Sequence, residues 1–156
     1  ALPPRQTIPV VLDPVLAASS GARLLDAAGE RVLRTQLLAR ATLLTPNIPE
    51  AAALLDTAPA RSVAEQLRQA EALCALGPAA VLLKGGHGGG AEAVDVLVRA
   101  GVAPRQFAAA RRARGMRGSG CALASAIAAA LAAGAELGEA CARARNYVLD
   151  RLDANS

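Results

Sequence analysis

Aromatic side chains are almost absent from this chain. Phe107 and Tyr147 are the only two among its 156 residues, and tryptophan is missing. The hydrophobic core must therefore be built from Leu, Val and Ala. Stacking of bases on aromatic rings, which single-stranded nucleic-acid binders use, is disfavoured. With 53% hydrophobic and 19% charged residues, the composition is that of a globular domain.

Cysteine and long apolar runs are also scarce. The three cysteines, Cys74, Cys121 and Cys141, are odd in number and form no CxxC pair. This argues against a disulfide framework and against a zinc site, and it fits a reducing compartment, so we expect a cytoplasmic protein. No signal peptide is recognised, and the apolar run 122–133 is too short to span a bilayer, so we expect no membrane partner.

Lysine occurs once, at Lys84, and arginine supplies the rest of the 17 basic residues, which outnumber 13 acidic ones. Between Val96 and Ala135 there is no acidic residue but six arginines: Arg99, Arg105, Arg111, Arg112, Arg114 and Arg117. Such a field suits nucleotide phosphates or nucleic acid. The simpler interpretation is a solvated segment in an arginine-rich protein, and nucleic acid is the less favoured partner.

Apolar and amphipathic segments alternate along the chain. Apolar runs predict strands at 8–12, 41–44, 79–83 and 93–98, the last antiparallel, and leave 102–110 ambiguous. Helices are predicted at 29–40, 49–55, from a capping box at 62–65 onward, 119–133 and 137–152. This alternation indicates one α/β domain, over residues 1–156, with a mostly parallel sheet.

Polar residues follow three of the predicted strands. Asp13 comes after the first strand, Asn47 and Glu50 after the second, and Lys84 after the third. Ligands of open parallel sheets bind at this edge, so we expect these side chains to share one crevice. Each also has a plain structural interpretation. Asp13 suits a turn, Asn47 and Glu50 suit a helix cap, and Lys84 suits a solvated position.

The segment Arg117-Gly118-Ser119-Gly120-Cys121-Ala122 opens an Ala-rich helix. Backbone N–H groups at a helix N-terminus bind anions, most often phosphate. The helix dipole also favours negative charge on Cys121, which makes its thiol a candidate base. The alternative is a glycine turn capped by Ser119, with Cys121 as a small core residue. Cys74 and Cys141 are expected to pack on helix faces, and His87 to be structural or exposed.

Together these residues supply the parts that phosphoryl transfer needs. Asp13, Asn47 and Glu50 offer oxygen ligands for Mg²⁺. Lys84 is a point charge for phosphate. The N–H groups from Gly118 to Cys121 can form an anion hole, and Cys121 can accept the proton of an attacking hydroxyl.

Four motifs, in order, resemble the hydroxymethylpyrimidine/phosphomethylpyrimidine kinase family of thiamin biosynthesis, within the ribokinase-like superfamily. They are Val11-Leu12-Asp13-Pro14-Val15 followed by Ser20-Gly21; Leu44-Thr45-Pro46-Asn47-Ile48-Pro49-Glu50-Ala51; Val81-Leu82-Leu83-Lys84-Gly85-Gly86-His87; and Gly118-Ser119-Gly120-Cys121-Ala122-Leu123 followed by Ser125-Ala126-Ile127. The last corresponds to the family's Gly-Thr-Gly-Cys loop, with Ser119 in place of Thr.

The resemblance implies a three-layer α/β/α fold that lacks the N-terminal βα units of longer family members. It implies ATP and Mg²⁺ as cofactors, with Asn47 and Glu50 organising Mg²⁺ and phosphate and Lys84 near the nucleotide phosphates. Gly118, Ser119, Gly120 and Cys121 fall on the anion hole, with Cys121 as the base. The reaction would move the γ-phosphate of ATP to hydroxymethylpyrimidine and then to its monophosphate.

This chain departs from the family in length and in the segment 108–117. Residues 108–116 replace a more polar strand and turn, and Arg117 stands where histidine is frequent. The chain is therefore interpreted as a fragment, as a nucleotide-binding module without turnover, or as a small enzyme completed by dimerisation. An uncovered sheet edge favours a homodimer. Another ribokinase-like kinase, such as a pyridoxal kinase, is the alternative enzyme.

Overall fold

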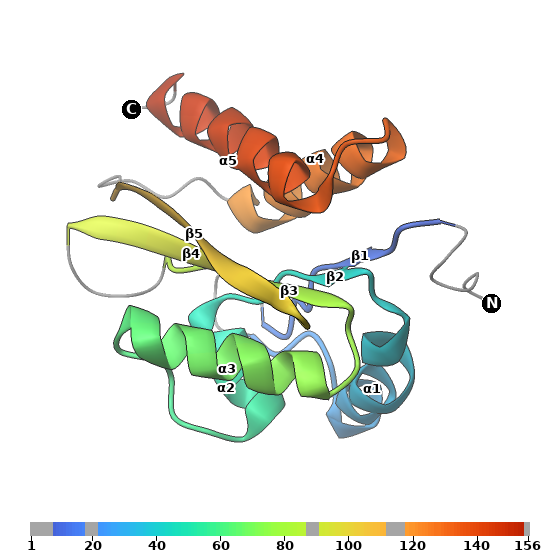
Figure 1. The fold of residues 1–156 in the computed structure, drawn as a ribbon. Helices are drawn as coiled ribbons and strands as arrows, with labels where there is room; N and C mark the ends of the chain where they lie inside the picture. Colours follow the sequence, from blue (N-terminus) through green and yellow to red (C-terminus); the bar gives the residue numbers. More distant parts are fainter. Residues whose placement is uncertain (1–7, 18–21, 87–90, 112–117, 155–156) are drawn as a thin grey trace.

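The computed structural model describes residues 8–17, 22–86, 91–111 and 118–154, and it contains one sheet with helices on both faces (Figure 1). The five strands lie side by side in chain order. They are β1 (Val11–Leu12), β2 (Leu43–Leu44), β3 (Ala80–Leu83), β4 (Glu92–Arg99) and β5 (Val102–Ala110). The expected α/β class is confirmed.

The sheet is mixed rather than mostly parallel. β1, β2 and β3 pair in parallel, whereas β3–β4 and β4–β5 pair antiparallel. The predicted antiparallel fourth strand is confirmed, and the ambiguous segment 102–110 is a full strand. Its strand identity follows from pairing with β4 along most of its length, through a tight turn at Gly101 with φ +74°. Tertiary pairing thus decides what local composition left open.

The helices form two layers (Figure 1). α1 (Ala27–Val32), α2 (Ile48–Leu55) and α3 (Val63–Ala75) cover one face, and α4 (Ser119–Ala132) and α5 (Leu137–Ala154) cover the other. Both parallel connections, β1 to β2 and β2 to β3, step across the sheet in the same direction. Right-handed crossovers then place all three of their helices on one face. Among the described residues, no helix has the length and apolar character needed to cross a membrane.

The predicted helix at 29–40 is only partly correct, because its hydrogen-bonding pattern changes along its length. After α1 the chain continues as a π-helical segment, Leu33–Leu37, and a 3₁₀ turn, Leu38–Arg40. Leu33 and Leu38 are both buried. They are five positions apart, and the wider π turn brings both side chains to the core side.

Two separate hydrophobic clusters occupy the two faces of the sheet. Val81 and Leu83 point into the cluster beneath α1, α2 and α3, whereas Ala80 and Leu82 point into the cluster beneath α4 and α5. All four are buried because both faces of β3 are covered. The continuous apolar run 79–83 is the expected pattern for such a central strand.

Side chains fix the starts of α2 and α3. Ser62 Oγ accepts a hydrogen bond from Glu65 N at 3.2 Å, as its position in the predicted capping box requires. Glu65 itself accepts from Arg61 N rather than from Ser62 N, so only half of that box forms. The complete capping box is found instead at Asn47 and Glu50.

We predict that Leu82→Ala and Leu83→Ala each lower the free energy of unfolding by about 2–5 kcal/mol, because each leaves a cavity in one of the two clusters. Urea unfolding followed by circular dichroism measures both. Leu76→Ala is the control, since Leu76 is 43% exposed and should change stability by less than about 0.5 kcal/mol. A small loss at either Leu82 or Leu83 would show that one face of β3 is not packed as described.

Candidate functional site

The carboxyl ends of β1, β2 and β3 and the start of α4 border one cleft of about 1040 Å³. Every site residue predicted from the sequence lines it: Asp13, Asn47, Glu50, Lys84, Gly118, Ser119, Gly120 and Cys121. The expectation that strand ends and the glycine loop share one crevice is confirmed. The roles of these residues remain predictions.

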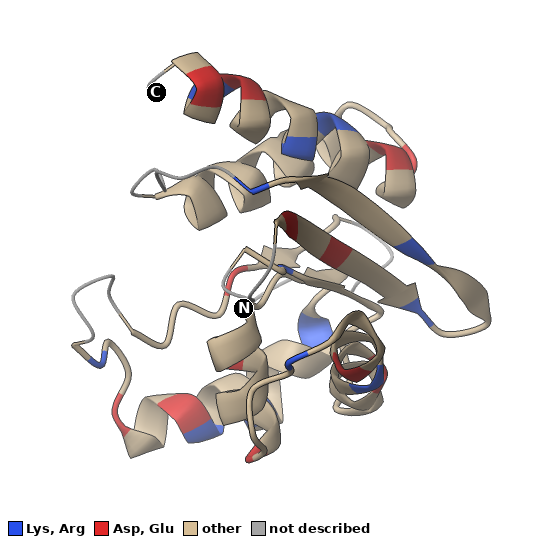
Figure 2. Ribbon diagram, turned by 90° about the vertical axis from the view of Figure 1, so that its left-hand side faces the viewer, with Lys and Arg blue, Asp and Glu red and all other residues tan. Residues whose placement is uncertain are grey.

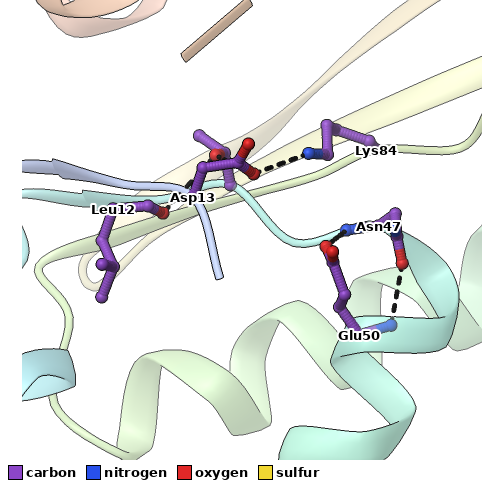
Figure 3. A network of polar contacts seen from close by, with 6 residues as sticks. Leu12, Asp13, Asn47, Glu50 and Lys84 are labelled. Carbon is purple, nitrogen blue, oxygen red and sulfur yellow. Dashed lines mark hydrogen bonds and ion pairs between the residues drawn. The ribbon is translucent and has the colours of Figure 1, made fainter. Parts of the chain in front are cut away.

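Asp13 and Lys84 form an ion pair at the centre of this group (Figure 3). Lys84 Nζ lies 2.9 Å from Asp13 Oδ1, and the two side chains are 14% and 13% exposed. Thr45 Oγ1 donates to the same carboxylate oxygen at 3.2 Å. Thr45 is fully buried, and its backbone N donates to Leu12 O at 2.9 Å. The ends of three adjacent strands therefore hold one carboxylate in place.

The start of α4 lies directly against this ion pair. A Cβ at Gly120 would stand 3.0 Å from Lys84 Nζ and 3.7 Å from Asp13 Oδ2. Glycine at position 120 thus lets the helix end approach the ammonium group closely. Lys84 is also fixed through its backbone, because its N donates to Pro46 O at 2.8 Å.

The N-terminal turn of α4 offers backbone N–H groups for an anion. Gly118 has φ +77°, a conformation that favours glycine, and the helix has no side-chain cap. Hydrogen bonding within the helix begins with Ala122 N donating to Gly118 O at 2.8 Å. The N–H groups of Ser119, Gly120 and Cys121 precede that bond, and all three residues line the cleft. This is the helix-end arrangement that binds phosphate.

Asn47 and Glu50 both cap a helix and line the cleft. Glu50 N donates to Asn47 Oδ1 at 2.8 Å, and Asn47 N donates to Glu50 Oε2 at 2.8 Å (Figure 3). Glu50 is 8% exposed. Burial raises its pKa above the ordinary 4.5, against the lowering effects of the Asn47 backbone and of Lys84, and the charge of Asp13 raises it further. A cation beside Glu50 would favour its ionised form.

The described residues contain no group of three or more His, Cys, Asp or Glu side chains that could hold a metal by themselves. Asp13 and Glu50 supply two carboxylates on one cleft. Mg²⁺ is bound in proteins through one or two carboxylates together with waters and substrate phosphates. The residues therefore fit Mg²⁺ that binds together with a phosphate ligand.

The three cysteines occupy different environments. Cys121 is exposed, Cys74 is half-buried and Cys141 is buried. Burial raises the pKa of Cys141 to about 12, and it also raises the pKa of Cys74, whose thiol donates to Val98 O at 3.6 Å. Both lie in or against the two hydrophobic clusters, which confirms the packing role predicted for them.

The described arginines of the segment between Val96 and Ala135 have different partners. Basic and acidic residues both occur in each helix layer (Figure 2). Arg99 lies 4.0 Å from Glu136, Arg105 stacks over Phe107, and Arg111 donates to backbone carbonyls. Arg112, Arg114 and Arg117 lie outside the described residues, as does His87.

Sequence reasoning missed a second ion pair on the cleft, between Asp95 of β4 and Arg145 of α5. Arg145 Nε lies 2.8 Å from Asp95 Oδ2, and both side chains are nearly buried. Two sequence signals were present. Asp95 interrupts an apolar strand, and Arg145 follows Cys141 by four residues, which puts it beside the buried side of its helix.

Comparison with known proteins gives a consistent result. The model of the phosphomethylpyrimidine kinase family matches residues 2–156. The hydroxymethylpyrimidine/phosphomethylpyrimidine kinase of Salmonella typhimurium is 47% identical over 122 residues, which are 77% of this chain and 45% of that protein. The enzyme of the same name from Rhizobium meliloti is 43% identical over 144 residues, 92% of this chain and 54% of that protein.

Solved structures agree with the sequence matches. A phosphomethylpyrimidine kinase from Clostridium difficile has a TM-score of 0.76 at 35% identity, over 92% of this chain and 57% of its own. The pyridoxal kinase of Staphylococcus aureus in complex with AMP-PCP and pyridoxal has a TM-score of 0.78 at 26% identity, over 89% of this chain and 49% of its own. This chain spans about half the length of the curated relatives named above.

We predict that iodoacetamide at neutral pH modifies Cys121 well before the other two cysteines, because only Cys121 is exposed and burial suppresses thiolate formation at Cys74 and Cys141. Peptide mass spectrometry of a reaction time course measures the order. The Cys121→Ser variant is the control and should stay unmodified over the same period. Early modification of Cys74 would contradict the described packing.

We predict that Glu50→Gln raises the stability of the protein at neutral pH. The raised pKa of Glu50 means that the folded state favours the neutral acid. In the parent protein, protonated Glu50 therefore contributes stability that is fully present below pH 4.5 and is lost as the pH rises through the folded-state pKa. Gln keeps an oxygen acceptor for Asn47 N without the charge. Urea unfolding at a series of pH values should show a difference at neutral pH that disappears below pH 4.5.

The exposed Glu71 provides the control for this series, since Glu71→Gln should shift stability little at any of these pH values. A Glu50→Gln variant that is less stable than the parent protein at neutral pH would refute the assignment of a desolvated carboxylate.

Proposed function

Since this chain belongs to the phosphomethylpyrimidine kinase family, we propose that it carries the phosphate-transfer site of an ATP-dependent kinase. The substrates are hydroxymethylpyrimidine and its monophosphate, in thiamine biosynthesis. The observation that carries this proposal is the convergence of Asp13, Lys84 and the α4 N-terminus, which come from three distant parts of the sequence, on one cleft.

The cleft provides two kinds of positive charge for the phosphates of ATP. Lys84 Nζ is a point charge placed beside the helix end, and the N–H groups of Ser119, Gly120 and Cys121 add the positive end of the helix dipole. The fold itself holds both. Such preorganised donors stabilise the charge that develops on the transferring phosphoryl group.

Asp13 and Glu50 would hold Mg²⁺ through oxygen ligands, with Asn47 fixing the orientation of Glu50 through their shared capping box. The ion would supply positive charge that offsets the charge of the nucleotide phosphates. Asp13 lies between Lys84 and Thr45, so its carboxylate keeps a fixed orientation toward the cleft.

Cys121 is the proposed general base. The hydroxymethyl oxygen of the substrate attacks the γ-phosphorus, and the bond from that phosphorus to the oxygen bridging to the β-phosphate breaks. ADP leaves, and the hydroxyl proton passes to the Cys121 thiolate at Sγ. Cys121 is exposed in the first turn of α4, beside the N–H groups proposed as the anion hole, and this supports assigning both roles to that turn.

Two observations favour a pyrimidine over a pyridoxal substrate. The fold alone does not discriminate, because the TM-scores of 0.76 and 0.78 are nearly equal. Sequence identity is higher to the phosphomethylpyrimidine kinase, at 35% against 26%. The curated relatives at 42–47% identity also carry the hydroxymethylpyrimidine or thiamine biosynthesis names.

We further propose a cytoplasmic homodimer. The three cysteines are free in the structure, which suits a reducing compartment. Among the described strands, β1 and β5 each pair on one side only, so the sheet has edges to which another strand could be added. The alternative to a kinase is a nucleotide-binding module without turnover. Measurements of Mg·ATP binding and of phosphorylation distinguish the kinase from this module.

Calorimetric titration with Mg·ATP tests the phosphate site. We expect saturable binding that Lys84→Met weakens about ten- to hundredfold, because a charge-assisted contact is lost while the aliphatic stem is kept. Arg68→Met is the matched control, since Arg68 is exposed on α3 and does not line the cleft. Equal effects of the two substitutions would overturn the assignment of Lys84.

Turnover tests the role of Cys121. We expect Cys121→Ala to leave the Mg·ATP affinity unchanged and to lower the rate of pyrimidine phosphorylation by about 10²–10⁴-fold, the usual contribution of a positioned base. ADP release in a coupled assay measures the rate. Binding without turnover in the unsubstituted protein would identify the nucleotide-binding module instead.

A further inference from the structure

The peptide that follows Lys84 is held in an unusual way. A Cβ at Gly85 would stand 2.0 Å from Val94 O, so no other residue fits without moving β4. Gly85 N donates at 2.8 Å to a side chain, Asp95 Oδ1. The β3–β4 pairing ends at Leu83 and Val96. Beyond that pair, the Asp95 carboxylate accepts the hydrogen bond from Gly85 N in place of a backbone carbonyl of β4.

Arg145 fixes this carboxylate. Its Nε lies 2.8 Å from Asp95 Oδ2, while Nη2 donates to Ala93 O at 3.0 Å and Nη1 to Ala108 O at 3.3 Å. One guanidinium from α5 therefore contacts both β4 and β5 and orients the acceptor of Gly85 N. The two side chains are 12% and 13% exposed.

Stability alone does not account for this arrangement. A nearly buried ion pair is typically no more stabilising than two apolar side chains of similar volume, because both charges must be desolvated. What apolar residues cannot supply is an oriented acceptor for Gly85 N. The next peptide is held in the same manner, since Arg111 donates to Gly86 O and to Glu92 O.

The contacts of Asp95 and Arg145 fix the backbone beside Lys84. Its own N donates to Pro46 O on the β2 side, and the following N–H is fixed on the β4 side by Asp95. A lysine side chain has four flexible carbons, so its ammonium is placed well only if its backbone is fixed. Position is critical because Nζ must fit between Asp13 and the α4 helix end.

We propose that Asp95 and Arg145 are positioning residues that aim Lys84 at the phosphates of the nucleotide. The inference rests on the proposed function, because it assumes that Lys84 binds those phosphates. It assigns to α5 a part in nucleotide binding that runs through a guanidinium, a carboxylate and one backbone N–H.

A double-mutant cycle with Mg·ATP binding as the readout tests this. The Asp95→Leu/Arg145→Leu variant removes the acceptor and both charges without leaving an unpaired buried charge. We expect about tenfold weaker binding, a loss comparable to one charged hydrogen bond. In the Lys84→Met background the same pair of substitutions should cause no further loss, since their effect passes through Lys84.

The matched control is Asp95→Asn/Arg145→Leu, which removes both charges but keeps an oxygen that can accept from Gly85 N. It should lose less Mg·ATP affinity than the Leu pair, because the acceptor for Gly85 N is kept although Arg145 no longer orients it. Thermal unfolding of each variant establishes that it is folded. If the Leu pair does not fold, Arg145→Lys should speed hydrogen exchange at Gly85 N and weaken Mg·ATP binding together.

The outcomes separate the two proposals. If the Leu pair weakens binding equally with and without Lys84, the ion pair has a general structural role and the inference is wrong. The inference is also wrong if the Asn and Leu variants lose affinity equally. It is likewise wrong if Arg145→Lys changes neither the hydrogen exchange at Gly85 N nor the Mg·ATP affinity. If the parent protein shows no Lys84-dependent binding of Mg·ATP, the proposed function fails and the positioning role fails with it.

Discussion

Burial of β2 and β3 on both faces determines where everything else in this structure lies. Leu43, Leu44 and the four residues of β3 are buried between the two helix layers, so their backbone groups must be paired within the sheet, and β2 and β3 pair in parallel. Parallel pairing aligns the carboxyl ends of the strands at one edge. Polar residues that follow those ends are then brought together regardless of their separation in the sequence, and Asp13 meets Lys84 across 71 positions.

The site holds its charges in pairs, and this organises the cleft electrostatically. Asp13 neutralises Lys84, and Asp95 neutralises Arg145, so neither cation is desolvated alone. Glu50 is different, since burial acts on it more strongly than its partners do and raises its pKa. A divalent cation stabilises the ionised form of such a desolvated carboxylate more than it stabilises that of an exposed one. The folded state thus keeps an unfavourable group where cation binding would relieve it.

Sequence reasoning located the site because its residues follow recognisable signals. Asp13 and Lys84 come directly after apolar runs, Asn47 stands three positions after another, and Gly118 precedes a long Ala-rich helix. Each position thus follows from local pattern and from the rule that strand ends share an edge. Segment 102–110 could not be assigned in this way, because its strand character comes from pairing with β4. The π and 3₁₀ turns after α1 likewise depend on packing of Leu33 and Leu38.

The pairing of Asp95 with Arg145 could not be predicted for the same physical reason. Each residue has a local sequence signal, but nothing local indicates that the two side chains meet across 50 positions. Gly85 and Gly120 are the positions at which the chain approaches its neighbours most closely around Lys84. Gly85 presses the end of β3 against Val94 O, and Gly120 lets α4 approach Lys84 Nζ. A side chain at either position would displace the lysine or its supports, so the two glycines determine how closely the sheet and α4 approach Lys84.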